Sequence, residues 1–184
     1  MAVTMRVAFG SGAPSGNEPT TLTNVDSEGG GTGFRFCLAN SATGTTSIQV
    51  PTATGTNFSY AVYLLLNVTG ADSNITISNR KAYSNGAPDT GLALWYKDGG
   101  TTYTQPAAAA DTASGSNGAT PTGYSALPTS SGAAATWHAT GVAASATGRN
   151  GNFLMLALGV SNNYAGGGNP NATVPDLKIV FDEA

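Results

Sequence analysis

The chain has 184 residues, of which 9% are charged, and its formal net charge is −3. The charged fraction lies far below the roughly 25% of an average soluble protein, which predicts a neutral, polar surface suited to association. The seven Lys and Arg residues are scattered singly, so no basic stripe exists to neutralise phosphates and nucleic-acid binding is not expected.

The N-terminal residues 1–12, MAVTMRVAFGSG, alternate apolar and polar side chains without a basic region or a continuous apolar run. This pattern predicts a first β-strand rather than a secretory signal. The longest apolar run, residues 58–68 (FSYAVYLLLNV), is interrupted by Ser59 and is shorter than the roughly 20 residues that span a bilayer as a helix. The sequence therefore predicts no membrane segment.

Period-two alternation recurs in short runs between clusters of Gly, Pro, Asn and Ser, which is typical of antiparallel strands with one buried face. No segment has the apolar spacing and caps of a long helix. The predicted strands are residues 2–9, 20–25, 34–39, 47–50, 58–68, 74–78, 92–97, 101–105, 135–140, 153–160 and 177–181.

Two of these runs carry more specific predictions. Asp98, Gly99 and Gly100 supply turn residues between strands 92–97 and 101–105, so these strands should form a tight hairpin. In residues 58–68, one face would hold Phe58, Val62 and their alternating neighbours, while the other face is also partly apolar. Such a strand lies centrally in its sheet, or its second face meets another subunit.

Eleven short strands without crossover helices predict an all-β fold, an antiparallel β-sandwich of the jelly-roll type. We expect a single domain over residues 1–184, with a loop rich in Ala, Gly, Ser and Thr inserted at 106–134.

The whole stretch 106–137 holds one charge, Asp111, and almost no large apolar side chain before Trp137. Structureless loops of this length are uncommon in compact domains and are usually functional or disordered. One hypothesis is that the stretch lies across a neighbouring subunit, anchored by Tyr124 and Leu127. The alternative is a mobile surface loop without a partner. Residues 24–33 and 162–173 are shorter loops of similar composition.

Residues with catalytic or metal-binding capacity are few. Cys37 is the only cysteine and lies in an apolar run, which indicates a core residue. His138 is the only histidine, so no His cluster can hold a metal, and alternation should place it opposite Trp137. Asp26 and Glu28 lack the acidic density of a calcium loop. We expect no metal, no cofactor and no catalytic residue.

Aromatic side chains are the remaining site signal, because rings exposed on a β-sandwich can stack on sugars. The alternative is that they fill the core or a subunit interface. The candidate residues for subunit docking or glycan contact are Trp95, Tyr96, Tyr103, Tyr124, Leu127 and Tyr164.

The few charges, the single cysteine, the all-β pattern and the long 106–137 stretch together resemble small virion proteins of tailed bacteriophages, especially capsid decoration (cement) proteins. The resemblance implies a homo-oligomer, a trimer above all, that binds the major capsid protein and stabilises the shell. It also implies a virion protein made in the host cytoplasm without a signal peptide. It transfers no functional residue.

Other functions stay open. A carbohydrate-binding module or adhesin tip would use the aromatic residues, and a tail tube or other tail protein would share the same composition. An enzyme is least expected, because the polar inventory is thin. The C-terminal strand 177–181 is a candidate for exchange between subunits, since a terminal strand can leave its sheet without tearing the chain.

Overall fold

The computed structural model describes residues 2–9, 21–24, 34–37, 48–103, 122–166 and 174–184, and it describes only the backbone of the first two ranges. Within these ranges the one helical segment is the short 3-10 turn η2 (Ser131–Ala133). None of the described ranges forms a helix with the length and apolar character needed to cross a membrane.

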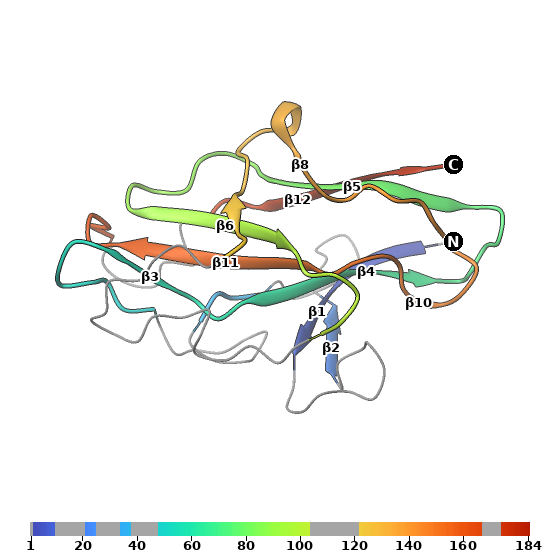
Figure 1. Cartoon of the computed structure of the whole chain (residues 1–184), viewed down its shortest axis with the longest axis horizontal. Coiled ribbons are helices and arrows are strands. Elements are labelled where there is room, and N and C mark those ends of the chain that lie inside the picture. Colours follow the sequence, from blue (N-terminus) through green and yellow to red (C-terminus); the bar gives the residue numbers. More distant parts are fainter. Residues whose placement is uncertain (1, 10–20, 25–33, 38–47, 104–121, 167–173) are drawn as a thin grey trace.

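Two antiparallel sheets pack against each other, which confirms the predicted all-β sandwich (Figure 1). Sheet A has the order β2 (Thr21–Asn24), β1 (Ala2–Phe9), β4 (Val62–Thr69), β11 (Leu154–Ser161), β6 (Leu92–Asp98) and β7 (Ser125–Ala126), with β10 (Gly148–Arg149) on β4 and β3 (Thr56–Phe58) on β11. Sheet B has the order β12 (Leu177–Glu183), β5 (Thr76–Ser84) and β8 (Ala135–His138), with β9 (Val142–Ala143) beside β5.

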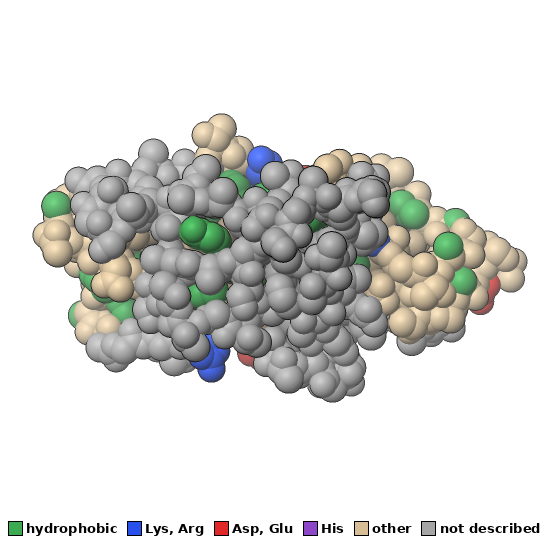
Figure 2. All heavy atoms as spheres, turned by 90° about the horizontal axis from the view of Figure 1, so that it is seen from below, with side chains coloured by type: hydrophobic (Ala, Val, Ile, Leu, Met, Phe, Trp, Pro, Cys, Tyr) green, Lys and Arg blue, Asp and Glu red, His purple; other side chains and the backbone are tan. Residues whose placement is uncertain are grey.

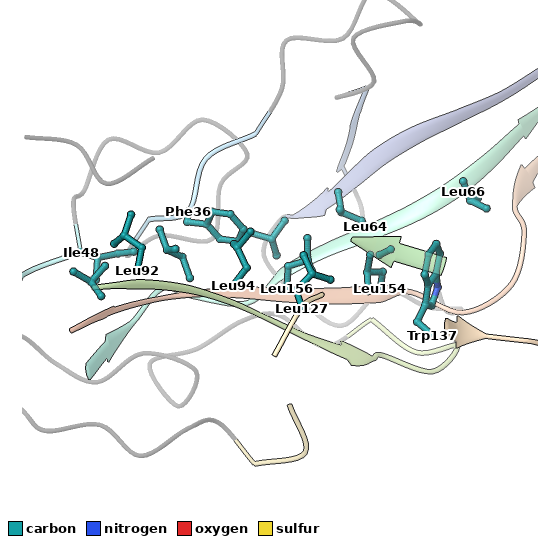
Figure 3. Packing of buried hydrophobic residues seen from close by; sticks show 14 of the residues in the cluster. Phe36, Ile48, Leu64, Leu66, Leu92, Leu94, Leu127, Trp137, Leu154 and Leu156 are labelled. Carbon is teal, nitrogen blue, oxygen red and sulfur yellow. The ribbon is translucent and has the colours of Figure 1, made fainter. Parts of the chain in front are cut away.

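The main core lies between the two sheets. Alternate residues of β4, β6 and β11 face sheet B, and Trp137 of β8 meets them from the other side (Figure 3). Burial of such apolar side chains stabilises a fold by about 25 cal/mol per Å² removed from water. We call the face of sheet A that contacts sheet B its inner face.

The opposite, outer face of sheet A carries a second apolar cluster. Tyr63 and Leu65 of β4 lie there with Tyr103 and Phe153, and all four are buried. Strand β4 pairs with β1 on one side and with β11 on the other. Residues 62–68 of the apolar run therefore form a central strand buried on both faces, which is the first of the two predicted alternatives.

The predicted single strand 58–68 is divided into β3 and β4. Between the pairs Leu156–Val62 and Gly159–Phe58, the chain entering β4 contains one residue more than β11. The Ser59 hydroxyl accepts the Leu158 N–H at this bulge (3.0 Å). One extra residue reverses the alternation of faces. Phe58 therefore lies on the outer face, and the prediction that it shares a face with Val62 is wrong.

The predicted hairpin 92–105 is wrong. Strand β6 is paired with β11 on one edge and with β7 on the other, which leaves no edge for residues 101–103. After β6, the Asp98 carboxylate accepts the Gly100 N–H (2.8 Å), and Gly99 and Gly100 exchange backbone hydrogen bonds with Phe153. The turn residues redirect the chain toward β11.

A second bulge lies in β5. Asn79 has a positive φ of 47°, and residues 79 and 80 together oppose Phe181 of β12. Ile77 faces the interior before the bulge, and Arg80 and Ala82 face it afterwards. The bulge therefore turns a charged side chain into the protein.

The remaining strand predictions differ in outcome. Those at 2–9, 20–25, 74–78, 135–140, 153–160 and 177–181 correspond to strands, and β5 extends to Ser84. Residues 34–37 and 48–50 are not strands, and the rest of those two predictions lies outside the described residues. The two-residue strands β7, β9 and β10 were not predicted.

Candidate functional site

The six aromatic and apolar candidates divide between the two faces of sheet A. Three of them face the inner core: Tyr96, Leu127 and Tyr164. The other three, Trp95, Tyr103 and Tyr124, belong to the outer face, as described below. Tyr103, Leu127 and Tyr164 are buried by their own chain, whereas Trp95, Tyr96 and Tyr124 are half-buried.

On the outer face, Trp95 packs edge-on against Phe58 with ring centroids 6.4 Å apart. Gly159 makes room for this pair, because a Cβ there would lie 3.0 Å from Phe58 Cε1 and 3.3 Å from Trp95 Nε1. Farther along the sheet, Tyr63 packs edge-on against Tyr103 at 5.0 Å and against Phe153 at 5.7 Å. The outer face of sheet A therefore carries two groups of packed aromatic rings.

Tyr124 joins this outer face next to β7. The Lys97 ammonium lies 5.8 Å from the centre of its ring, a cation–π distance. Burial raises the pKa of the Tyr124 hydroxyl, and Tyr63 raises it further. The Tyr124 hydroxyl and Trp95 Nε1 are both buried without a hydrogen-bond partner. Such groups carry a desolvation cost that a ligand atom could relieve.

A polar cluster at one end of the sandwich was missed by sequence reasoning. The fully buried Arg80 donates from Nη1 to the Thr140 carbonyl (3.0 Å) and from Nη2 to Asn150 Oδ1. Asn150 is also buried, and its Nδ2 donates to the carbonyls of Val142 (3.3 Å) and Ala143 (3.2 Å). Burial lowers the pKa of Arg80, and Nε has no partner.

The loop after β10 closes over this cluster. The Asn152 backbone N–H donates to His138 Nδ1 (2.7 Å), and the Asn152 side-chain amide donates to both Asp98 oxygens (2.8 and 2.9 Å). The Trp137 indole N–H donates to the Asn152 carbonyl (3.2 Å). Gly151 is required here, because its φ is +86° and a Cβ would lie 2.8 Å from Arg80 Cζ.

Alternation predicted that His138 lies opposite Trp137, and this prediction is wrong. The register shift in β8 pairs His138 with the inward-facing Arg80, so both side chains point to the same side of the sheet. His138 is hydrogen-bonded there, because its Nδ1 accepts the Asn152 N–H (2.7 Å). Burial lowers its pKa, Arg80 and Arg149 lower it further, and Asp98 acts in the opposite direction. The neutral ring with Nδ1 as acceptor is therefore favoured. Since Nδ1 accepts a backbone hydrogen bond, it does not serve as a proton acceptor for a substrate.

Chemically, the cluster joins loops and strands rather than presenting reactive groups. No three His, Cys, Asp or Glu side chains in the described ranges lie close enough together to hold a metal ion. Cys37 is buried, as its apolar setting predicted. Asp26, Glu28 and residues 104–121 of the long stretch lie outside the described residues.

Comparison of the chain with protein-family models, with curated proteins and with solved structures finds no significant match.

Proposed function

We propose that this chain is a non-enzymatic virion structural protein, a capsid decoration protein that binds the outer capsid surface and stabilises the shell. The observation that carries the proposal is that the buried and acidic side chains named below form hydrogen bonds within their own chain. The buried Arg80 and Asn150 hold loops, and the carboxylates of Asp72, Asp98 and Asp182 accept hydrogen bonds from their own chain. These polar groups of the described residues are therefore engaged in holding the fold rather than free to act on a substrate.

The surface supports the same proposal. Charged residues make up 9% of the chain, and the described residues that are visible at the two ends of the face in Figure 2 are mostly uncharged. A weakly charged surface favours packing against other protein surfaces, because little charge must be desolvated or paired on contact. Binding energy in such a contact would be spread over many apolar and backbone contacts.

Two measurements test this proposal. Light scattering behind a sizing column, over a dilution series, should give a stable oligomer, and a trimer would agree with the resemblance to decoration proteins. Immunogold labelling should then place the protein on capsid heads from cells that make it. Label confined to tails would favour a tail protein, and a monomer absent from particles would overturn the virion proposal.

The alternative is a carbohydrate-binding module. The observation that favours it is the pair of buried polar atoms without partners, Trp95 Nε1 and the Tyr124 hydroxyl. Both residues lie on the outer face, and strand pairing makes them diagonal neighbours, since Trp95 opposes Ala126 and Tyr96 opposes Ser125. A sugar bound there would stack on the indole and accept hydrogen bonds from both groups.

A glycan array separates the two functions. Saturable binding of one sugar class that is lost in Trp95→Ala would support the module. Tyr83→Ala is the matched control, because Tyr83 is also half-buried but belongs to β5 in the other sheet. Absence of binding across the array, or equal loss in both variants, would dismiss the alternative.

A further inference from the structure

Strand β12 forms one edge of sheet B, and within the described ranges it pairs only with β5. Its seven residues alternate between half-buried and exposed from Leu177 to Asp182. The bulge opposite β12 lies in β5, at Asn79 and Arg80, so β12 itself keeps a regular period of two. A regular edge strand is a template for pairing with another strand.

The backbone groups that face outward can be identified from the pairing with β5. Ala184 and Thr76 exchange two backbone hydrogen bonds (2.7 and 3.0 Å), and the Asp176 carbonyl accepts the Asn85 N–H (2.8 Å). Antiparallel ladders alternate, so even-numbered residues of β12 bond to β5. The N–H and C=O groups of the odd-numbered residues Leu177, Ile179, Phe181 and Glu183 point to the free edge.

We propose that two copies of this chain associate through their β12 edges, antiparallel about a two-fold axis at Val180. In this register Ile179 bonds to Phe181 of the second copy and Leu177 bonds to Glu183, so the outward backbone groups of the four odd-numbered residues all find partners. About eight backbone hydrogen bonds result. The two four-stranded B sheets become one continuous sheet.

The side chains select this register. Lys178 and Asp182 are four residues apart on the exposed face of β12, so an axis at Val180 places each Lys178 opposite Asp182 of the other copy. An axis at Ile179 would instead place Asp176 opposite Asp182, a pair of like charges. Two exposed contacts within the chain compete with this pairing. Lys178 lies 3.5 Å from Asp176, a surface pair of little strength. Asp182 Oδ2 accepts a hydrogen bond from Asn79 Nδ2 (2.7 Å), and a carboxylate can accept a second hydrogen bond from Lys178 of the other copy.

Apolar contacts favour the same pairing. Val180 is 42% exposed, and within the described ranges Val50 is the only other large apolar side chain that is exposed. At the axis it would contact Val180 of the second copy in a non-hydrogen-bonded pair, where side chains lie closest. Leu177, Ile179 and Phe181 pack against the edge of the core but stay half-buried, and a second β12 would cover them further.

Charge substitution tests the proposal by sedimentation or light scattering over a dilution series. The wild-type chain should form an even-numbered oligomer through this edge, a dimer in the simplest case, and a closed trimer would overturn the pairing. Lys178→Asp should raise the dimer dissociation constant about tenfold, because the axis creates two like-charge pairs from one substitution. The exchanged double variant Lys178→Asp, Asp182→Lys should restore most of the affinity. Arg35→Asp, the same charge change at an exposed residue outside sheet B, is the control and should leave the affinity unchanged.

Cysteine crosslinking tests the register independently. Val180→Cys should form a disulfide between copies, because the two Cβ atoms face each other at the axis. Lys178→Cys should not, since the two copies of residue 178 would lie roughly 14 Å apart. The buried Cys37 makes the wild-type chain the blank for both variants.

Several outcomes would overturn the pairing. These are a wild-type monomer at all concentrations, failure of the double variant to recover, or crosslinking of Lys178→Cys as readily as Val180→Cys. Exchange of β12 between subunits can be distinguished from edge pairing. Exchange would crosslink Val180→Cys of one copy to Lys81→Cys of another, because these two residues lie opposite each other in the pairing of β12 with β5. The proposed capsid function survives each of these results, since immunogold labelling tests it separately.

Discussion

At the residue scale, Arg80 is a buried cation without a carboxylate partner among the described residues. Arg80→Met would remove the charge but leave Asn150 Oδ1 and the Thr140 carbonyl without a donor, a loss of about 1–3 kcal/mol in the free energy of unfolding. Asn150→Leu should cost a similar amount. The double variant should cost about 1 kcal/mol less than the sum, because the two groups are direct partners.

Urea denaturation of the four proteins measures this coupling. Asp72→Leu is a suitable control partner, because Asp72 caps the Asn74 N–H in a turn and has no contact with Arg80 in the structure. The contact would be contradicted if the losses in the free energy of unfolding simply added in the double variant Arg80→Met, Asn150→Leu, as they should in Arg80→Met, Asp72→Leu.

His138 should make the stability of the fold depend on pH. Its pKa in the folded protein is lowered by burial and by Arg80, so below about pH 6.5 the unfolded chain binds more protons than the folded one. The contribution to stability is therefore present above pH 6.5 and is lost as the pH falls toward the folded pKa. Protonation would also place a cation beside Arg80 and Arg149.

The measurement is the urea midpoint between about pH 5 and pH 8, in the wild type and in His138→Asn. Asn can accept the Asn152 N–H through its side-chain oxygen without titrating, so this variant should have a flatter profile across the interval. Equal slopes in the two proteins would show that other groups determine the acid sensitivity.

The candidate site could be predicted only in part from the sequence. The aromatic residues stand out by composition, and three of the six do share the outer face of sheet A. The contact between Arg80 and Asn150 could not be predicted from the sequence. It depends on the bulge at Asn79, which turns Arg80 inward, and on a loop that lies 70 residues farther along the chain. A local pattern carries no information about such a contact.

At the element scale, Gly159 allows β3 and β6 to place their rings on the same part of β11. Gly159→Ala should lower the free energy of unfolding by about 1–3 kcal/mol, since the added methyl would lie 3.0 Å from both Phe58 Cε1 and Thr56 Cγ2. The tryptophan emission should also change, because Trp95 must move. Gly132→Ala, with no atom within 4 Å of its Cβ position, is the control.

Period-two alternation located most strands, because each face of a sheet is either buried or exposed over several residues. It failed where one residue changes the register. The bulges at Ser59 and Asn79 reverse the faces of β3 and β5, and neither is apparent from apolar spacing. The hairpin 92–105 failed for another reason: turn residues show where a strand ends, but not which strand occupies its free edge.

At the scale of the whole molecule, the low charge content distinguishes two kinds of contact. Pairing through β12 includes two exposed Lys178–Asp182 pairs, which salt screens. Attachment to a capsid through the remaining neutral surface would depend little on charge. The two proposed associations should therefore respond differently to ionic strength.

We expect the proposed capsid binding, measured by co-sedimentation with capsid particles, to change less than about threefold between about 0.05 M and 0.5 M NaCl. Few charges are present to be screened, since the chain has seven basic and ten acidic residues. Dimerisation through β12 should weaken over the same range, and Lys178→Asp should reverse the sign of its salt dependence, because screening then reduces a repulsion. A tenfold loss of capsid binding in high salt would mean that a few charge pairs, rather than extended apolar and backbone contact, hold the chain on the shell.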